Sequence, residues 1–398
     1  MITKETEPKM YRIGKEEIDA VAAVIESGEL FKINDALRET EHAEEEMREK
    51  FGVDHAILMT SGHAALTSAL IALGIGPGDE VIVPAYTYIS TALAVVGAGA
   101  IPVIAEVDET LTISPKDIEK KITKHTKAIM PVHIQGFPCD MDSIMAIAKK
   151  YDLKAVEDAC QADGGTYNGK RLGTIGDAGA YSFNYFKVIS CGEGGALLTN
   201  DRTVFERSLI YHDSAAVAYF GNQLDGVESS LFCGSEYRTN EIAAAILRKQ
   251  LVRLDDILAD LRKMRDHFMS ELKGLCEFVP SNDVNGGCAT TLALRFKTAD
   301  AAKAFHETTD GVSTTIPINT GKHVYSIWTP IINKVGAFNP LMDPFKMEAN
   351  KDIVPDYTVD MCPETLDLLA RTVYIAINPD WTAAERDDKL DIIKKALA

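Results

Sequence analysis

The chain has 398 residues, of which 46% are hydrophobic and 25% are charged. These proportions are typical of folded globular proteins and exclude a disordered or collagen-like chain. At roughly 150 residues per domain, the length predicts two or three domains. Lysine and arginine number 41 against 59 aspartates and glutamates, a net charge of −18. Because no basic run could neutralise a line of phosphates, nucleic acid is excluded as a partner.

Membrane insertion, secretion and metal binding find no support in the sequence. The longest weakly polar stretch, residues 92–105, is broken by Gly97, Gly99 and Pro102 and is too short to span a membrane. The N-terminal residues lack the apolar core of a secretory signal, so we expect a cytoplasmic protein. Seven cysteines without a C-x-x-C pair predict reduced thiols rather than disulfides or structural zinc, and we expect no metal site.

Short β-branched runs alternate with helix-like segments between residues 51 and 200. The runs are HAILMTS, EVIVPAYT, IPVIAEV, KAIMPVHI and LKAVEDAC. Such alternation predicts βαβ units and an α/β fold with a mostly parallel sheet covered by helices on both faces. In sheets of this kind, ligands bind beyond the carboxyl ends of the strands.

A long helical pattern begins near residue 240 and is expected to bridge two domains. The pattern from about residue 276 to the end predicts a smaller α+β domain, with the segments CATTLALRF, ADAAKAFHE and TVYIAI. We therefore divide the chain into a large α/β domain with an N-terminal arm, residues 1–250, and a small C-terminal domain, residues 251–398.

Two adjacent acids end the predicted strand in VEDACQADGG. Alternation along a strand sends Glu157 and Asp158 to opposite faces, and Gln161 could reach the same site as one of them. An acid at a strand end can equally cap a turn or bind in a loop. On its own, this motif leaves both interpretations open.

The segment YSFNYFKVIS places Lys187 after a predicted strand that contains Ser182. Its neighbours Phe186, Val188 and Ile189 are apolar, and desolvation there would favour the uncharged, nucleophilic amine. The alternative is a solvated surface lysine. The glycine cluster that follows, residues 192–195, matches neither a dinucleotide fingerprint nor a nucleotide-hydrolase phosphate loop.

The segment TSGHAAL places Ser61 and Gly62 at a strand-to-helix junction, where free N–H groups can hold a phosphate or simply cap the helix. Together with the aromatic Tyr88, the acid Asp158 and a lysine 29 residues later, this junction predicts pyridoxal phosphate. That cofactor needs N–H groups for its phosphate, stacking for its ring, an acid for its pyridine nitrogen and a lysine for its aldehyde.

At this point the sequence resembles the DegT/DnrJ/StrS sugar aminotransferases, which have fold type I of the aspartate aminotransferase superfamily. The motifs that carry the resemblance are SGHAAL, GIGPGDEVIVPAYTY, PVHIQGFPCDMD, VEDACQADGG, YSFNYFK followed by GEGG, and GSEYRTNEIAAAI. The resemblance implies a large domain with a mostly parallel seven-stranded sheet, a smaller α+β domain, and pyridoxal 5′-phosphate as cofactor.

Carried over by position, the resemblance also implies roles for individual residues. Lys187 would form the Schiff base, Asp158 would pair with the pyridine nitrogen, and Gln161 would lie near the phenolic oxygen. Tyr88 would stack on the cofactor ring. The residues expected at the phosphate are Ser61, Gly62, His63, Ser182 and Glu236.

A homodimer with shared active sites follows from the same resemblance, because family members contribute the segment with Tyr237 and Arg238 from a partner subunit. His323, in GKHVYSIWTPI, is expected to join these two residues in substrate binding. The chain departs from the family at His63, where threonine is usual, and at Glu236, where asparagine is usual. We hypothesise that Glu236 pairs across the interface with a protonated His63 close to the phosphate.

The predicted activity is transfer of an amino group, with L-glutamate as the expected donor, to a keto- or aldehydo-sugar in cell-surface polysaccharide or amino-sugar synthesis. The acceptor could be nucleotide-linked or a free sugar, such as that of the 8-amino-3,8-dideoxy-octulosonate transaminase subgroup. Alternatives are a sugar dehydratase, which would carry histidine in place of Lys187, and a non-enzymatic sensor that keeps the fold. A nicotinamide oxidoreductase is disfavoured because no G-x-G-x-x-G follows an early strand.

Overall fold

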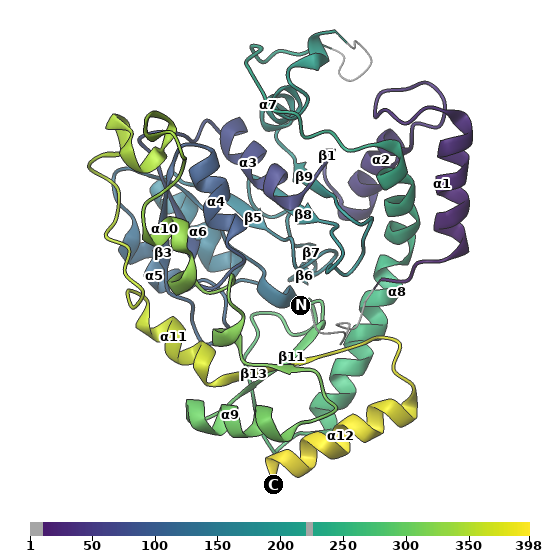
Figure 1. The fold of residues 1–398 in the computed structure, drawn as a ribbon, viewed down its shortest axis with the longest axis vertical. Coiled ribbons are helices and arrows are strands. Elements are labelled where there is room, and N and C mark those ends of the chain that lie inside the picture. Colours follow the sequence, from purple (N-terminus) through teal and green to yellow (C-terminus); the bar gives the residue numbers. More distant parts are fainter. Residues whose placement is uncertain (1–10, 220–225) are drawn as a thin grey trace.

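The computed structural model describes residues 11–219 and 226–398 of the chain (Figure 1). Part of the N-terminal segment considered above as a secretory signal, residues 1–10, lies outside the described residues. None of the described helices combines the length and the apolar character that crossing a bilayer requires.

Seven described strands form the central sheet, in the order β1-β9-β8-β5-β4-β2-β3. They are β1 (His55–Met59), β2 (Glu80–Pro84), β3 (Ile101–Ala105), β4 (Thr126–Ile129), β5 (Lys154–Asp158), β8 (Ala178–Ser182) and β9 (Gly195–Thr199). Neighbours from β3 to β8 pair in parallel, whereas β9 is antiparallel to both β8 and β1. The predicted mostly parallel, seven-stranded sheet is confirmed.

Helices cover both faces of this sheet because its strands are apolar on both sides. Within β1, Ala56 and Leu58 join one core while Ile57 and Met59 join the other. The first core includes side chains of α2 (Glu39–Phe51), α5 (Pro115–Lys121), α6 (Met141–Tyr151) and α8 (Glu241–Glu271). The second includes side chains of α3 (Gly62–Ala72), α4 (Ser90–Gly97) and α7 (Arg202–His212).

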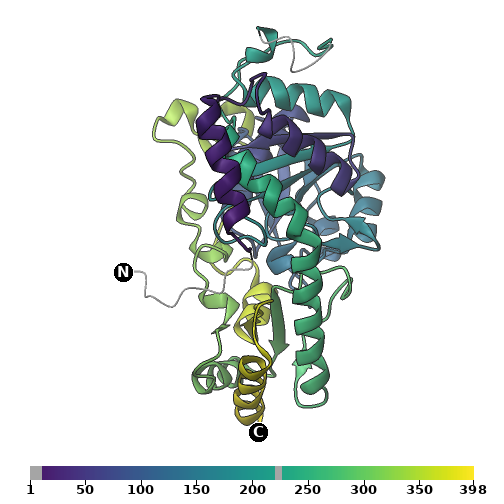
Figure 2. The same cartoon turned by 90° about the vertical axis from the view of Figure 1, so that its right-hand side faces the viewer.

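The helix α8 connects the central sheet to a second sheet near the C-terminus (Figures 1 and 2). Asn240 caps its first turn, and the helix then runs for 31 residues through the predicted boundary at residue 250. The helix α1 (Lys15–Ser27) lies alongside it. The division of the chain at residue 250 remains a prediction, because this boundary falls inside a continuous element.

The second sheet is antiparallel, in the order β10-β11-β13-β12. It consists of β10 (Glu277–Phe278), β11 (Thr291–Arg295), β13 (Thr372–Ala376) and β12 (Thr314–Thr315), with α9 (Ala299–Thr308) and α12 (Ala383–Leu397) packed beside it. Between β12 and β13 the chain returns to the large sheet through α10 (Thr329–Ile332) and α11 (Pro363–Ala370). On this path the N–H of Tyr325 donates to the carbonyl of Ala85 (3.0 Å).

Candidate functional site

The predicted site residues lie where four parallel strands of the large sheet end. The strand β1 leads into Ser61, β2 leads into Tyr88, β5 ends at Asp158 and β8 ends at Ser182. These strands point in the same direction, so their carboxyl ends meet at one edge of the sheet. This is the edge at which ligands bind in open α/β sheets.

Glycines bring the start of α3 into direct contact with the end of β8. A Cβ atom on Gly62 would lie 2.4 Å from Sγ of Cys160 and 3.1 Å from Cβ of Ser182, so no larger residue fits there. At Gly195 an added Cβ would lie 2.2 Å from the carbonyl carbon of Ser61. Ser61 caps the helix, since its side chain accepts from the N–H of Ala64 (3.1 Å). The structure thus brings Ser61, Gly62 and Ser182 together around a helix N-terminus, which favours an anion.

Glu157 and Asp158 face opposite sides of β5, as the alternation predicts. Glu157 is fully buried and accepts three peptide N–H groups of the loop at residues 173–176 (2.5–2.8 Å), which makes it structural. Asp158 is 5% exposed; its Oδ2 lies 2.7 Å from the Thr91 hydroxyl, and its Oδ1 accepts from the N–H of Cys160 (3.2 Å). The acid available to a ligand is therefore Asp158.

Tyr88 and His323 meet although 235 positions separate them in the sequence. Their ring centroids lie 5.5 Å apart at an angle of 53°, and Nζ of Lys322 lies 4.9 Å from the Tyr88 ring centroid. The N–H of Thr87 donates to the carbonyl of His323 (2.9 Å), which fixes this C-terminal segment beside the end of β2. The rings of Tyr88 and His323 and the ammonium group of Lys322 therefore lie together at the border of the site.

The pKa of His323 is lowered to about 4, first by burial and then by the charges of Lys322 and Lys187. We expect the ring to stay neutral down to pH 5, whereas an unperturbed histidine titrates near 6.5. In the folded state His323 binds fewer protons than in the unfolded state, so its contribution to stability is present above about pH 6.5 and is lost as the pH falls through 4. An NMR titration of the cofactor-free protein that finds a midpoint above 6 for this ring would contradict the expectation.

Lys187 lies in the loop that follows β8 and is half-buried. Val188 and Ile189 are buried as expected, but Phe186 is 62% exposed, so the predicted apolar surround is only partly present. The reason is that the loop carries Phe186 outward while its neighbours pack into the core. Burial raises the pKa of Cys160, and the positive charge of Lys187 opposes this rise, whereas at His323 the same charge adds to the lowering of the pKa that burial causes.

Gln161 is held by the main chain of a neighbouring loop. Its Oε1 accepts from the N–H of Gln135 (3.0 Å), a residue with a left-handed φ of 53°. Oε1 of Gln135 in turn accepts from the hydroxyl of Thr291 in β11 (3.0 Å). Within the described residues the amide nitrogen of Gln161 makes no hydrogen bond, so its two N–H groups are available to a ligand.

The sequence profile of the DegT/DnrJ/EryC1/StrS aminotransferase family matches residues 11–316. The chain belongs to this family. SpsC, a spore coat polysaccharide biosynthesis protein of Bacillus subtilis, is 33% identical over 96% of this chain and 94% of its own length. The GDP-perosamine synthase of Escherichia coli O157:H7 is 40% identical over 59% of this chain, and the match spans 63% of that relative, somewhat less than two thirds.

Solved structures agree with this family assignment. DesV of Streptomyces venezuelae, solved in complex with a ketimine intermediate, aligns with a TM-score of 0.77 and 29% identity over 96% of this chain and 94% of that chain. The aminotransferase from Psychrobacter cryohalolentis aligns with a TM-score of 0.78 and 28% identity over 96% of this chain and 97% of that chain. The predicted fold, the aminotransferase class and pyridoxal phosphate as cofactor are thereby confirmed at the level of the family.

Tyr237 and Arg238, which the family resemblance assigns to a neighbouring subunit's site, lie beside the end of β1. The Tyr237 carbonyl accepts from the N–H of Thr60 (2.9 Å). The Arg238 guanidinium pairs with Glu236 (2.6 Å) and donates to the carbonyl of Asp213 (3.0 Å). Within the described residues no hydrogen bond joins Arg238 to the acid or the lysine of its own chain, so its role in substrate binding stays a prediction.

The hypothesis of a Glu236–His63 pair meets an obstacle in the single chain. Glu236 is already paired with Arg238, and its side chain is 51% exposed. Burial lowers the pKa of His63, the opposite of the elevated value that the hypothesis requires, and no described group is bonded to its buried Nδ1. A pair across an interface stays a prediction, and it would require Glu236 to turn away from Arg238.

Four residues at the site escape the sequence analysis. Thr91 lies three positions after Tyr88 at the start of a helix, a spacing that could have indicated a side chain on the same face. Lys322 is adjacent to His323, which had been selected, and Gln135 lies in the motif PVHIQGFPCDMD, which carried the family resemblance. Asp163 lies two positions after Gln161 and is fully buried. The sequence could not indicate this burial, because it depends on tertiary packing.

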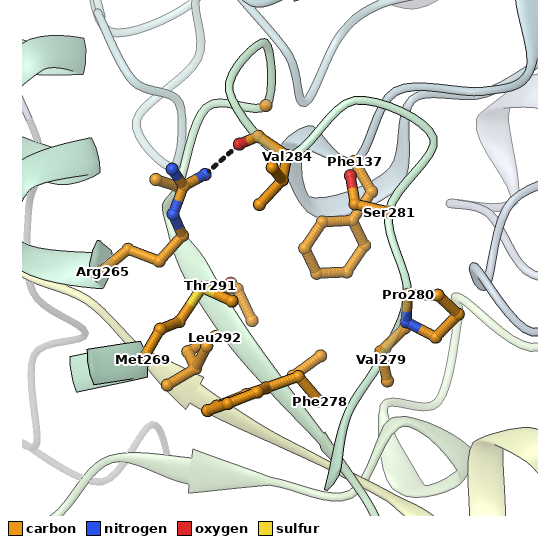
Figure 3. A pocket seen from close by; sticks show the side chains of 13 residues that line it. Phe137, Arg265, Met269, Phe278, Val279, Pro280, Ser281, Val284, Thr291 and Leu292 are labelled. Carbon is orange, nitrogen blue, oxygen red and sulfur yellow. Dashed lines mark hydrogen bonds between the residues drawn. The ribbon is translucent and has the colours of Figure 1, made fainter. Parts of the chain in front are cut away.

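A separate hollow of about 50 Å³ lies between α8 and the second sheet (Figure 3). Phe137, Met269, Phe278 and Leu292 line it, and the Arg265 guanidinium at its rim donates to the carbonyl of Val284. The volume suits a water molecule or two rather than a cofactor. This hollow is therefore distinct from the candidate catalytic site.

Proposed function

We propose that the chain transfers an amino group from L-glutamate to the carbonyl carbon of a sugar, with Lys187 as the reactive amine. The observation that carries this proposal is the convergence, at one sheet edge, of the Lys187 loop, the buried Asp158 and the N-terminus of α3. Family membership supports the same reaction class.

The residues present fit pyridoxal phosphate. The start of α3, with Ser61 as its cap and Ser182 adjacent, suits a phosphate dianion. Asp158 is a buried carboxyl group that could pair with the pyridine nitrogen, and the Tyr88 side chain is 37% exposed. When bound, the cofactor supplies an aldehyde that condenses with amines and a ring that withdraws electrons from the reacting carbon.

Each protein group then has a defined task. Lys187, once its amine is free, would take the proton from the amino donor's α-carbon as general base and deliver it as general acid to C4′, the aldehyde carbon of the cofactor. Asp158 holds a proton on the ring nitrogen, and the Thr91 hydroxyl, 2.7 Å away, fixes its carboxylate. His323, beside Tyr88, is expected to stay neutral. Its ring can therefore donate or accept a hydrogen bond with a sugar hydroxyl and does not repel the nearby ammonium of Lys322.

A nucleotide-linked keto sugar is the acceptor class that the relatives favour. Their names specify GDP-perosamine and dTDP-linked amino sugars, and the name of SpsC refers to a polysaccharide. We propose that the product serves cell-surface polysaccharide or amino-sugar synthesis. A free sugar of the octulosonate type is also tested as an acceptor, although the names of these relatives do not point to such a substrate. Seven free cysteines fit action in the reducing cytoplasm.

Two half-reactions test the proposal. Protein loaded with pyridoxal phosphate should convert L-glutamate to 2-oxoglutarate in an amount equal to the protein, and L-aspartate serves as the comparison donor. Keto sugars linked to GDP or dTDP, and the free octulosonate aldehyde, are then added to the aminated form. Return of the original absorbance identifies the acceptor. If no amino acid yields an oxo acid, the aminotransferase proposal fails and a non-enzymatic sensor gains support.

The same protein preparation distinguishes an aminotransferase from a sugar dehydratase and from a nicotinamide oxidoreductase. A sugar dehydratase would consume a hydroxylated sugar without needing an amino donor, and the presence of Lys187 argues against it. A nicotinamide oxidoreductase would bind NAD and change the absorbance of this cofactor as it oxidises or reduces a sugar. Turnover that requires an amino donor excludes both activities.

We propose further that the active unit is a homodimer with shared sites. We expect that mixing Lys187→Ala and Arg238→Ala proteins, each inactive alone, restores up to about a quarter of wild-type activity through hybrid dimers, because one of two sites in half of the dimers regains both residues. In the single chain Arg238 pairs with Glu236 and donates to the carbonyl of Asp213. The physical reason for the expectation is that, within the described residues, no hydrogen bond or ion pair joins Arg238 to Lys187 or Asp158 of its own chain. Subunit exchange is checked with differently tagged proteins. Absence of rescue despite exchange would show that Arg238 does not act across the interface.

A further inference from the structure

Two threonines form a buried chain of hydroxyl groups behind Asp158. Thr87 lies just before α4, and Thr91 lies in the first turn of that helix. Oγ1 of Thr87 is 2.7 Å from Oγ1 of Thr91, and the Thr91 hydroxyl is 2.7 Å from Oδ2 of Asp158. Both threonines are 0% exposed, and Asp158 is 5% exposed. The three side chains therefore form one continuous hydrogen-bonded chain that is shielded from water.

Each hydroxyl proton has a defined place in this chain when Asp158 is ionised. A carboxylate only accepts hydrogen bonds, so the Thr91 hydroxyl must donate to Oδ2. The Thr91 oxygen then accepts from the Thr87 hydroxyl. Within the described residues the competing acceptor is the carbonyl of Tyr88, which lies farther away, at 3.4 Å from Oγ1 of Thr87 and 3.1 Å from Oγ1 of Thr91. The hydrogen bonds therefore run in one direction, from Thr87 through Thr91 to the carboxylate.

The main chain around Thr87 is fixed by the second half of the protein. The N–H of Thr87 donates to the carbonyl of His323 (2.9 Å), and the N–H of Ile89 donates to the carbonyl of Lys322 (3.0 Å). On the other side of Thr87, the carbonyl of Ala85 accepts from the N–H of a residue in the same returning segment. Because these bonds flank Thr87 on both sides, its hydroxyl cannot move away from α4 without breaking them.

The carboxylate at the end of the chain is held at both oxygens. The N–H of Cys160 donates to Oδ1 of Asp158 (3.2 Å), and the Thr91 hydroxyl donates to Oδ2. Two donors on different oxygens fix the plane of the carboxylate. This plane matters because a hydrogen bond weakens steeply when donor and acceptor are misaligned.

We propose that Thr87 is a positioning residue for Asp158: acting through Thr91, it fixes the carboxylate that pairs with the pyridine nitrogen of pyridoxal phosphate. The proton that Thr87 donates polarises the Thr91 hydroxyl, and this makes Thr91 a stronger donor to Oδ2. The proposal deepens the proposed function, on which it rests for the role of Asp158. It extends the site by one residue, which lies behind Thr91.

A merely structural role for the two threonines makes a different prediction. If their hydroxyl groups only stabilised the start of α4, losing either one would weaken the binding of every ligand in the site to the same extent. A role that acts through Asp158 affects only ligands that carry the ring nitrogen. The two roles can therefore be separated by comparing two ligands that differ in this one atom.

Ligand binding to the cofactor-free protein makes this comparison. Dissociation constants are measured for pyridoxal phosphate and for its 1-deaza analogue, in which a C–H group replaces the ring nitrogen. We expect Thr91→Val to reduce the preference for pyridoxal phosphate about fivefold and Thr87→Val to reduce it about twofold to threefold, the range of a single hydrogen bond. Thr87→Ser keeps the hydroxyl group and should retain the preference of the wild type.

A double variant shows whether Thr87 acts through Thr91. The preference of Thr87→Val/Thr91→Val should equal that of Thr91→Val alone, because the Thr87 hydroxyl has no effect on Asp158 once its partner is missing. The matched control is Thr365→Val in α11. Thr365 is equally buried, and its hydroxyl donates to a different buried carboxylate, that of Glu106. This variant should keep the preference of the wild type.

An unchanged preference in Thr87→Val, or an equal loss of affinity for both ligands, overturns the proposal. If the valine variant does not fold, as judged by circular dichroism, Thr87→Ala removes the same hydroxyl group and is measured in the same way. A wild type that binds both ligands equally would contradict the role of Asp158 in the proposed function and, with it, this proposal. Because binding requires no amino donor and no turnover, the result is independent of whether the chain transaminates.

Discussion

Lys187→Ala should abolish transamination, with a loss of turnover of about a thousandfold or more, equivalent to about 4 kcal/mol at roughly 1.36 kcal/mol per decade. The expectation follows from the two tasks proposed for one amine, attachment of the cofactor and movement of the proton. Turnover is measured with L-glutamate and the acceptor found in the panel. Borohydride reduction of the wild type should add the cofactor's mass to the peptide that contains Lys187 and to no other.

The matched control for this substitution is Lys154→Ala. Lys154 is a surface lysine, 49% exposed, at the start of β5, and it pairs with Asp177 (2.9 Å). Its removal should leave turnover within about twofold of the wild type, because surface pairs contribute little. Borohydride label on a different lysine, or full activity of Lys187→Ala, would show that the reactive amine has been assigned to the wrong residue.

The large sheet could be predicted because its strands are local features of the sequence. Runs such as EVIVPAYT are apolar on both faces, and the helices between them supply the crossovers that parallel strands need. The antiparallel strand β9 was harder to anticipate. The loop at residues 183–194 joins it to β8 without a crossover helix, but pairing direction depends on where the sheet has room for another strand.

Some features of the site could likewise be predicted from local sequence, whereas others depend on tertiary packing. The ends of β1, β5 and β8 were located by motif and by alternation, which correctly separated Glu157 from Asp158. Contacts such as Tyr88 with His323 could not be predicted, because the second half of the chain returns to the sheet by an irregular path. The exposure of Phe186 was missed for a related reason: the sequence shows that this loop residue is apolar, but not whether the loop turns its side chain towards the core or towards solvent.

Asp158→Asn should reduce turnover by about a hundredfold or more while leaving the fold intact. A hundredfold loss corresponds to about 2.7 kcal/mol at roughly 1.36 kcal/mol per decade. The physical reason is that a neutral amide cannot stabilise a proton on the ring nitrogen, whereas the buried carboxylate can. Turnover is measured at saturating L-glutamate, so that the loss is read as a change in kcat rather than in donor binding.

A comparison with Asp158→Ala separates chemistry from structure at this residue. Oδ1 of Asp158 accepts the N–H of Cys160, a turn contact that asparagine can keep and alanine cannot. Both variants should therefore lose turnover equally, but only the alanine variant should also lose stability, by about 1 kcal/mol for one hydrogen bond. Thr91→Val, which removes the hydroxyl 2.7 Å from Oδ2, should cause a smaller loss of turnover because the carboxylate itself remains. If Asp158→Asn retained wild-type turnover while Asp158→Ala unfolded more easily, Asp158 would be a turn cap, and the acid that serves the cofactor would have to be sought elsewhere.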